Sequence, residues 1–488
     1  MSEKGITTLQ QPVRPAVLIP YLGQIGIALA ALASVPMGVA AVVGDGTALW
    51  RYLAVVAALL AVAIPMSRRP RPADMQPNEG LVITATVFVL SPFVMAFPLS
   101  SSGLSYGQGL FEAVSAVTTT GLSTLSSVEG RPASFLFARA WMQWYGGLGI
   151  VALLPLWIEP GPAARRLLGL DQPEGEDPMT SARFYARRIL IAYLVLTSGG
   201  FLLLWLLGTP LFTALVHTLA AVSTGGFSSL DAGLAALNRP AALGVVVLSV
   251  LGAVPFVAYL HGAHGGRRRL FRDPQVRALL AAGLLGTAGL AWLLHRSQTL
   301  DWSAAVYHAG VLAFSAQTTS GFSTLDPGTL GAGAKYLLIL MMASGGCLGS
   351  TAGGIKLIRL LIFFRLVQLL VQRTSLPRAA WVAPRLGGLE LDGDISLRAL
   401  LLILLFVVTI ALSWLPFLVA GWDPLDALFE VVSAVATTGL SVGVSQVGLA
   451  PALQAILCLD MWLGRLEILA MLVLVSPAVW HHHRHGPT

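Results

Sequence analysis

Long apolar stretches recur along the chain, with short polar connections between them. Ten of them hold about 20 residues or more, enough for a helix to cross a hydrocarbon core about 30 Å thick. They cover residues 16–42, 48–66, 80–99, 132–158, 182–208, 240–262, 274–295, 335–372, 395–420 and 451–479. The pattern predicts an all-α integral membrane protein with ten spanning segments.

Four shorter segments lie between these stretches and end in Thr, Ser and Gly. They cover residues 106–123, 211–228, 303–323 and 424–441, and each is too short to span a membrane as a helix. They align without gaps around one glycine each, at Gly121, Gly226, Gly321 and Gly439. Each interval between these glycines holds two long stretches and one short segment. This spacing predicts four pseudo-symmetric repeats, each made of a helix, a re-entrant pore loop and a helix, around one pore.

The predicted organisation has five parts. An N-terminal pair of transmembrane helices covers residues 1–72, and three pore repeats cover 73–165, 166–266 and 267–392. The fourth repeat, with a cytoplasmic tail, covers 393–488.

Non-helical backbone cannot face lipid, because unpaired N–H and C=O groups are costly there. Four equivalent segments that enter from one side can meet on an axis, where their carbonyls replace the hydration shell of a cation. Glycine permits positive φ, and the carbonyl end of each short helix carries partial negative charge. The predicted filter residues are Thr119, Thr120, Gly121, Thr224, Gly225, Gly226, Thr319, Ser320, Gly321, Thr437, Thr438 and Gly439.

Two alternatives stay open for this region. The short segments are also compatible with glycine-rich helix ends that pack closely, as small residues do in membranes. Asp231 and Asp326 stand just past two of the loops, where they either concentrate cations at the pore mouth or are ordinary solvated acids.

Composition and charge support the membrane assignment. Only 11% of the residues are charged, against about 25% in soluble proteins. The net charge of +7 would suit a nucleic-acid partner, but most of the 30 basic residues lie in alternate connections and the two tails. This asymmetry is typical of cytoplasmic loops, so we expect both termini in the cytoplasm, membrane lipid around the protein and no nucleic acid. Cys347 and Cys458 lie in or beside apolar stretches, which implies no disulfide framework.

A glycine-rich segment interrupts the stretch 335–372. It has five glycines in ten residues, each of which disfavours helix by about 1 kcal/mol relative to alanine. We predict an intramembrane gating loop at 344–354, with a helix-packing kink as the alternative. A phosphate-binding loop is excluded, because its lysine would have to follow a glycine. The candidate gate residues are Gly345, Gly346, Gly349, Ser350, Thr351, Gly353, Gly354 and Lys356.

Arg465 lies inside the last apolar stretch. A cation there costs about 2.5–3.5 kcal/mol, so such residues normally face a water-filled interior. We predict that Arg465 faces the conduction path and raises a barrier to cations. A structural salt bridge to another helix is the alternative. Glu467, two residues on, lies on a different helix face and is a poor partner.

The four segments around Gly121, Gly226, Gly321 and Gly439 resemble the filter segments of the Trk/Ktr/HKT superfamily of potassium transporters. The resemblance extends from about residue 80 to 479. The segment Gly345–Lys356 is very close to a signature of that family, and the extra N-terminal helix pair is most similar to its bacterial TrkH branch. The resemblance implies potassium as the substrate, channel-like uptake across a bacterial inner membrane, and a loop that blocks the path below the filter. It also implies a homodimer and a cytosolic TrkA-type regulatory subunit that binds NAD(H) or ATP/ADP, with no organic cofactor in this chain.

The four filter segments are nevertheless unequal. Ala436 stands where the other segments have Thr or Ser, and Gly225 adds a second glycine. Glycine at all four aligned positions favours potassium within the family, but unequal strands predict only modest selectivity against sodium.

Other classes of function fit less well. A secondary transporter built on broken helices predicts inverted repeats and paired discontinuous spans, whereas one broken span is expected here. A potassium-binding subunit of a Kdp-type pump is a closer alternative, and the Gly345–Lys356 signature argues against it. His217 and His308 lie in the short segments without a recognisable nucleophile, so we do not predict an enzyme.

Overall fold

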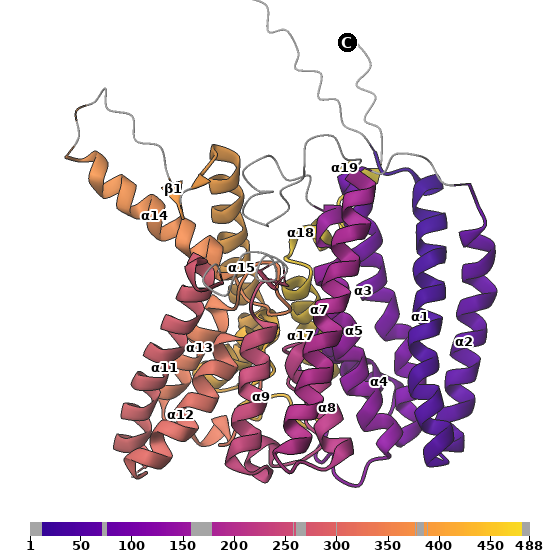
Figure 1. Ribbon diagram of the computed structural model, residues 1–488, viewed down its shortest axis with the longest axis horizontal. Helices are drawn as coiled ribbons and strands as arrows, with labels where there is room; N and C mark the ends of the chain where they lie inside the picture. Colours follow the sequence, from indigo (N-terminus) through magenta and orange to yellow (C-terminus); the bar gives the residue numbers. More distant parts are fainter. Residues whose placement is uncertain are drawn as a thin grey trace, which may run out of the picture.

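Helices that run between two opposite ends make up nearly all of the computed structural model (Figure 1). It describes residues 12–480 except 71–75, 158–177, 257, 260–269, 299, 376, 378–384 and 388. The predicted boundaries near 72, 165 and 266, and the C-terminal tail, lie outside these residues. Within them the only strands are β1 (Arg385–Leu386) and β2 (Leu389–Glu390), a short antiparallel pair in a connection between two helices.

Six described helices are long and apolar enough to cross a membrane. They are α1 (Pro15–Val43), α2 (Gly46–Ser67), α3 (Pro77–Leu99), α7 (Pro178–Leu206), α11 (Pro274–Gln298) and α15 (Gly393–Val419). A seventh long helix, α5 (Ala133–Trp157), covers the predicted stretch 132–158. The expectation of an all-helical protein that crosses the membrane several times is confirmed.

The remaining predicted spans are built from shorter helices. The stretch 335–372 forms α13 (Ala332–Ser344) and α14 (Leu357–Arg373), separated by a loop at the predicted place. The helix within 240–262, α9, covers Arg239–Gly252.

The prediction of one continuous span at 451–479 is wrong. This stretch forms α17 (Pro451–Arg465), α18 (Leu469–Val475) and α19 (Pro477–Trp480). The chain turns at Glu467 and Ile468, whose φ values are 53° and 62°. The turn lets the Glu467 carboxylate pair with Arg359 of α14, which satisfies a charge that a straight apolar helix would leave in hydrocarbon. Among the described residues, helix is interrupted within 335–372 and 451–479 and also after Gly252 within 240–262, whereas only the first of these interruptions was predicted.

The four short segments form half-helices, and Figure 1 places α4, α8 and α12 at the end far from the C-terminus. They are α4 (Tyr106–Val117), α8 (Leu211–Val222), α12 (Trp302–Gln317) and α16 (Pro424–Val435). Three of them begin at a polar cap: Ser105, Asp301 and Asp423 accept hydrogen bonds from backbone N–H groups of the first turn. Such caps satisfy donors that a helix start leaves unpaired.

These half-helices and the helices that follow them pack into a closed ring. Each half-helix contacts the helix after it, in the pairs α4–α5, α8–α9, α12–α13 and α16–α17. Each following helix also contacts the next half-helix, in the pairs α5–α8, α9–α12, α13–α16 and α17–α4. The last pair closes the ring, because α17 follows the fourth half-helix and α4 is the first.

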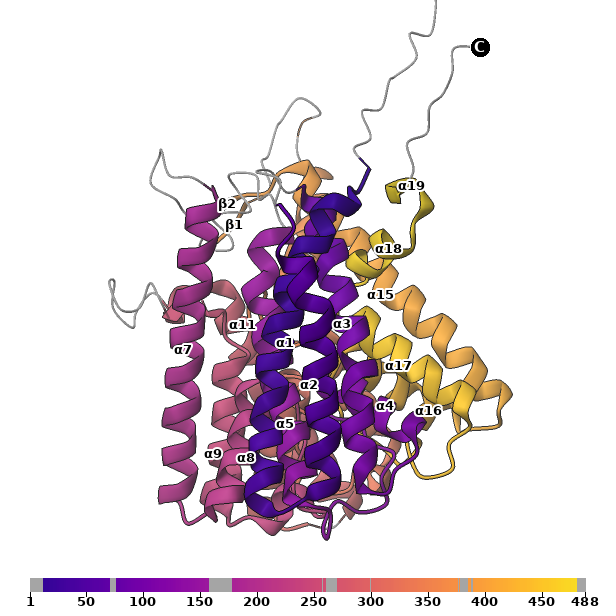
Figure 2. The same ribbon diagram turned by 90° about the vertical axis from the view of Figure 1, so that its right-hand side faces the viewer.

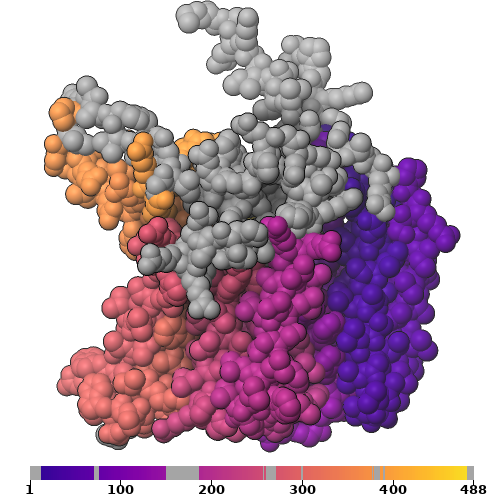
Figure 3. Space-filling model, viewed as in Figure 1, coloured from indigo at the N-terminus to yellow at the C-terminus, as the bar shows by residue number. Residues whose placement is uncertain are grey.

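Several helices lie outside this ring, among them α1, α2 and α14. α1 and α2 pack on each other and on α3; they lie at the right-hand side in Figure 1 and face the viewer in Figure 2. At the opposite side α14 projects away from the helical body, as the space-filling view shows (Figure 3).

Candidate functional site

The four half-helices end with the same local backbone. The second residue after each end is a threonine in the left-handed region, with φ of 56° at Thr119, 51° at Thr224, 52° at Thr319 and 49° at Thr437. At the first of them, Thr119 N donates to Ala116 O at 3.0 Å and Thr120 N donates to Ser115 O at 2.9 Å. This is the helix end that normally requires glycine. A β-branched residue in this conformation is strained by about 1–3 kcal/mol, and such strain clusters at ligand-binding sites.

Beyond these threonines the four segments meet in a closed ring. A Cβ atom on Gly121 would overlap the carbonyl oxygen of Gly225, the residue before the second aligned glycine. The relation repeats from Gly226 to Ser320 O, from Gly321 to Thr438 O, and from Gly439 back to Thr120 O. Only glycine fits at these four positions, and the contacts join all four segments around one axis.

Exposure follows the same pattern in every segment. The aligned glycines are partly exposed, while the residues on both sides of each are buried. The next residue in each segment is a large apolar side chain that is at most 3% exposed: Leu122, Phe227, Phe322 and Leu440. The apolar side chains anchor the segments in the surrounding protein, and the glycine backbone is what remains accessible.

Hydroxyl groups lie at the helix-facing end of this ring. The side-chain oxygens of Thr119, Thr437 and Thr438 are buried without a hydrogen-bond partner among the described residues. A buried polar atom without a partner requires an explanation, and a cation that accepts oxygen ligands supplies one.

The loop between α13 and α14 reaches this end of the ring. Gly353 N donates to Thr319 Oγ1 at 2.7 Å, and the hydroxyls of Thr224 and Thr351 are 3.3 Å apart. A Cβ atom on Gly353 would overlap the carbonyl oxygen of Ala436. The loop therefore contacts three of the four converging segments.

Backbone contacts explain why this loop is rich in glycine. Gly345, Gly349 and Gly354 have φ values of 68°, 77° and 74°. A Cβ atom on Gly345 would overlap Gly353 O, and one on Gly346 would overlap the Ala352 side chain. The two ends of the loop are pressed together, and residues with side chains would separate them.

Polar side chains hold the loop in place. Thr351 Oγ1 lies 3.1 Å from Val222 O and 2.9 Å from Gly252 O, and it donates its proton to these carbonyls. Ser350 Oγ donates to Cys347 O at 2.6 Å, and Lys356 Nζ donates to Ala352 O.

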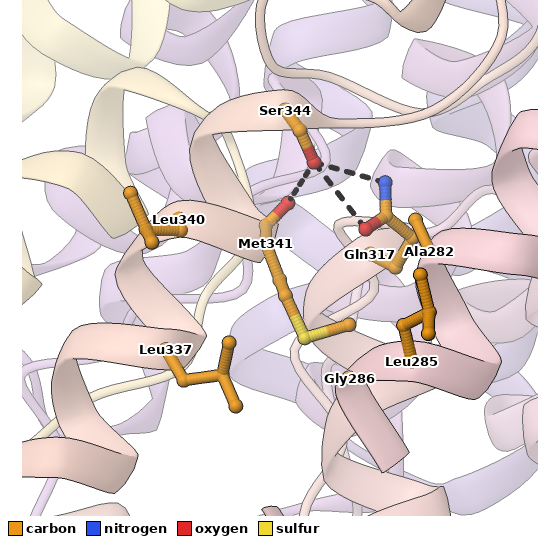
Figure 4. A pocket seen from close by; sticks show the side chains of 8 residues that line it. All are labelled: Ala282, Leu285, Gly286, Gln317, Leu337, Leu340, Met341 and Ser344. Atoms are coloured by element: carbon orange, nitrogen blue, oxygen red, sulfur yellow. Dashed lines mark hydrogen bonds between the residues drawn. The ribbon is translucent and has the colours of Figure 1, made fainter. Parts of the chain in front are cut away.

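A small pocket adjoins the base of this loop (Figure 4). It has a volume of about 250 Å³ and is lined by Ala282, Leu285, Gly286, Gln317, Leu337, Leu340, Met341 and Ser344. Gln317, the last residue of α12, donates to Ser344 Oγ at 3.0 Å and to Gly345 O at 2.7 Å. The amide thereby ties the first residues of the loop to a half-helix.

Arg465 lies directly against the loop. Its guanidinium donates to Thr351 O at 2.6 Å and to Gly146 O at 3.1 Å, and the residue is 3% exposed. None of the ion pairs in the described part of the chain includes Arg465. The salt-bridge alternative therefore finds no support there.

Asp231 and Asp326, the two residues predicted at the pore mouth, form hydrogen bonds that stabilise the outer loops. The Asp231 carboxylate accepts hydrogen bonds from Ser127 Oγ at 2.6 Å and Val128 N at 2.7 Å, which joins the outer loops of the first two segments. The Ser127 hydroxyl is the main cause of a lowered pKa of Asp231. Asp326 accepts from Gly328 N at 2.9 Å within its own turn. Both side chains are exposed, so these structural contacts leave their charge at the surface.

The comparison with known proteins agrees with this geometry. Residues 53–482 match the model of the TrkH family, which is described as a cation transport protein. The chain belongs to the TrkH family.

TrkH-family relatives cover nearly the whole chain. The Trk system potassium uptake protein TrkI of Halomonas elongata is 30% identical over 96% of this chain and 97% of its own length. The Trk system potassium uptake protein TrkH of Escherichia coli is 28% identical over 84% of this chain and 88% of its own length. The crystal structure of the potassium transporter TrkH from Vibrio parahaemolyticus superimposes with a TM-score of 0.83 at 24% identity, over 96% of this chain and 99% of that one.

Membership of the TrkH family makes this chain a transport protein and not an enzyme. The sequence matches the Gly-x-Ser-x-Gly nucleophile motif at 103–107 and at 439–443. Ser105 is a helix cap for α4, and Ser441 donates to the Glu430 carboxylate at 2.8 Å. Among the described residues neither serine forms a hydrogen bond with a histidine, since Ser105 pairs with Gln108 and Ser441 with Glu430, Ser445 and Gly443.

Sequence reasoning missed the side chains that hold the converging segments of this TrkH-family protein. Gln143 of α5 donates to Gly225 O and accepts from Phe227 N at 3.2 Å. Glu112 and Arg139 form a buried ion pair at 2.9 Å. Phe-Glu pairs precede the first and fourth glycines at equal distance, and that repeated spacing was the available signal.

Proposed function

We propose that this protein takes up potassium ions through a selectivity filter made by the four converging segments. The closed ring of glycines, each against the carbonyl of the next segment, carries the proposal. A ring of backbone carbonyls can replace the hydration shell of a monovalent cation, and the helix ends behind it favour positive charge. The relatives named as potassium uptake proteins support potassium as the ion.

In the proposed mechanism the ion passes down its electrochemical gradient. The filter consists of the twelve residues from Thr119 to Gly439 predicted above, with the carbonyls at the glycine level and the threonine hydroxyls at the inner end. The strands differ, since Gly225 and Ala436 break the pattern, so we expect modest discrimination against sodium.

The loop 344–354 acts as the gate in this proposal. It contacts the inner threonines of the filter, and its backbone would have to move for an ion to pass. Arg465 adds positive charge beside the loop and raises the barrier to a cation.

We further propose the arrangement of the protein in its membrane. Four pseudo-symmetric repeats with the boundaries given above surround the pore, and both termini and the basic connections face the cytoplasm of a bacterial inner membrane. The protein works as a homodimer with a cytosolic TrkA-type subunit that binds NAD(H) or ATP/ADP. The relatives named as Trk system potassium uptake proteins support this assembly.

Rubidium uptake by proteoliposomes tests the proposal. Purified protein should carry ⁸⁶Rb⁺ into vesicles loaded with potassium, and external potassium should compete better than external sodium. Vesicles without protein give the background. Rubidium uptake at background level would contradict potassium transport, and sodium competition equal to that of potassium would contradict a selective filter.

A further inference from the structure

Three of the four filter segments carry a polar side chain nine residues before the aligned glycine. These are Glu112, His217 and Glu430, and all three are 0% exposed. The third segment has Leu312 at this place. A buried polar side chain in a membrane protein needs partners, and the three find them in the same part of the structure.

Each of these side chains binds the serine two residues after the glycine. Glu112 Oε1 accepts from Ser123 Oγ at 2.6 Å, and Glu430 Oε1 accepts from Ser441 Oγ at 2.8 Å. His217 Nδ1 must donate to a carbonyl, Thr213 O at 2.9 Å, so neutral Nε2 accepts from Ser228 Oγ at 3.1 Å.

The two carboxylates also bind backbone N–H groups beyond the serine. Glu112 accepts from Thr124 N at 3.1 Å, while Glu430 accepts from Val442 N at 3.2 Å and from Ser445 N at 3.1 Å. Hydrogen bonds to a charged acceptor are the strong ones in proteins. Each carboxylate thus holds the outer end of its strand at several points.

The third segment is held differently. His308, on α12, lies with Nδ1 at 2.9 Å from Thr324 Oγ1, one residue further along the strand. The side chain at the position of the other three, Leu312, is apolar and buried. The third strand therefore lacks the contact that fixes the serine in the other strands.

We propose that Glu112, His217 and Glu430 are positioning residues that set cation selectivity by fixing the outer ends of three filter strands. One residue separates the glycine from the bound serine, and its apolar side chain is buried, so the serine contact fixes how the intervening carbonyls point. Carbonyls held in place favour the ion that fits their spacing, whereas free carbonyls adapt to a smaller one. This inference rests on the proposed potassium conduction.

Neighbouring strands are linked through the first of these residues. The second oxygen of Glu112 pairs with Arg139, whose guanidinium lies 3.7 Å from the centre of the Phe227 ring. Phe227 is the buried anchor of the second strand, so the contact at Glu112 acts on two strands. Glu430 has no ion-pair partner among the described residues, which makes it the simpler position for a test.

The test compares two substitutions of Glu430 in full-length protein in liposomes, by the ratio of ⁸⁶Rb⁺ to ²²Na⁺ uptake. Glu430→Leu copies the third segment and removes every contact of the carboxylate. It should lower the ratio about tenfold, the effect of losing a hydrogen bond to a charged group. Glu430→Gln keeps an acceptor oxygen and should retain most of the ratio. Leu312→Met, at the matching position without a polar contact, should leave the ratio unchanged.

A folding check and a second variant, Ser441→Ala, ensure that the experiment can refute the positioning role. If Glu430→Leu fails to fold, as judged by gel filtration, Ser441→Ala removes the same contact from the other side and should also lower the ratio. A Rb⁺/Na⁺ ratio that stays at the wild-type value in folded Glu430→Leu or Ser441→Ala overturns the positioning role. Absence of rubidium uptake by the wild type would instead refute the conduction on which the inference rests.

Discussion

At the scale of single residues, the aligned glycines are required for two separate reasons. Gly121 has a φ of 91°, which side chains rarely adopt, and a Cβ atom there would also overlap the next strand. Gly103 has a similar φ of 83° but nothing within 4 Å of a Cβ atom. A comparison of Gly121 with Gly103 therefore distinguishes the cost of positive φ from the cost of overlap with a neighbouring segment.

We expect Gly121→Ala to lower rubidium uptake by at least about tenfold, because the new methyl group must push the second strand out of the ring. Gly103→Ala has the same conformational cost of about 1–2 kcal/mol without the overlap, and it should keep most of its uptake. Uptake assays on equal amounts of folded protein measure both. Equal uptake by the two variants would mean that the close contact is unimportant.

We expect Arg465→Ala to raise the rate of cation uptake about tenfold, which corresponds to a barrier lower by ~1.4 kcal/mol. The guanidinium places positive charge beside the loop 344–354, and alanine removes it. Arg465→Lys keeps the charge and should stay near wild type. Slower uptake in the alanine variant would show that Arg465 acts by holding the structure.

Sequence reasoning identified the residues of the ring but not all of their chemistry. Glycine at a strand crossing is visible as a repeated motif, whereas a threonine in the left-handed region is not, because that position normally favours glycine. Gln143 and Arg139 were also missed. They lie on a spanning helix whose pattern is simply apolar, and their partners are distant in sequence.

At the scale of elements, the interruption at 345–356 was predictable and the one at 466–468 was not. The first contains many glycines, which weaken a helix wherever they occur. The second contains none, and the turn depends on the tertiary contact between Glu467 and Arg359. A local pattern can reveal weak helix propensity, but it cannot reveal a partner on another helix.

We expect Thr351→Val to increase rubidium uptake several-fold. The hydroxyl shares its one proton between Val222 O and Gly252 O, and loss of this hydrogen bond weakens the closed loop by about 1 kcal/mol. Valine has nearly the same shape, so the change removes polarity and little else.

Thr351→Ser is the matched control for this loop, since it keeps the hydroxyl, and its uptake should stay near wild type. A larger change, deletion of residues within 345–354, should raise uptake further. Unchanged uptake in the valine variant and in the deletion would contradict a gate at this place.

At the scale of the whole molecule, helices distant in sequence close one ring. The contact between α17 and α4 joins the C-terminal half of the chain to the N-terminal half. The four glycine-containing segments inside the ring contact one another in the same circular order. The gap-free alignment of the short segments predicted four units, and only the structure shows in which order they touch. The circular order follows the chain order, as expected when each unit packs against the next.

The predicted orientation can be measured with single cysteines. Cys347 and Cys458 are buried, so the background reaction should be low. Ser126→Cys, in the exposed loop after the first filter strand, should react with an impermeant maleimide in intact cells. Thr374→Cys, at the far end of α14, should react only after the membrane is opened. The reverse pattern would mean that the termini face outward.

The most direct test of the central claim is an experimental structure of the protein in rubidium chloride, with anomalous scattering to locate the ions. The account predicts rubidium density on the axis enclosed by Gly121, Gly226, Gly321 and Gly439, within coordination distance of their carbonyl oxygens. Glycines that lie apart, or a ring without rubidium on its axis, would contradict it.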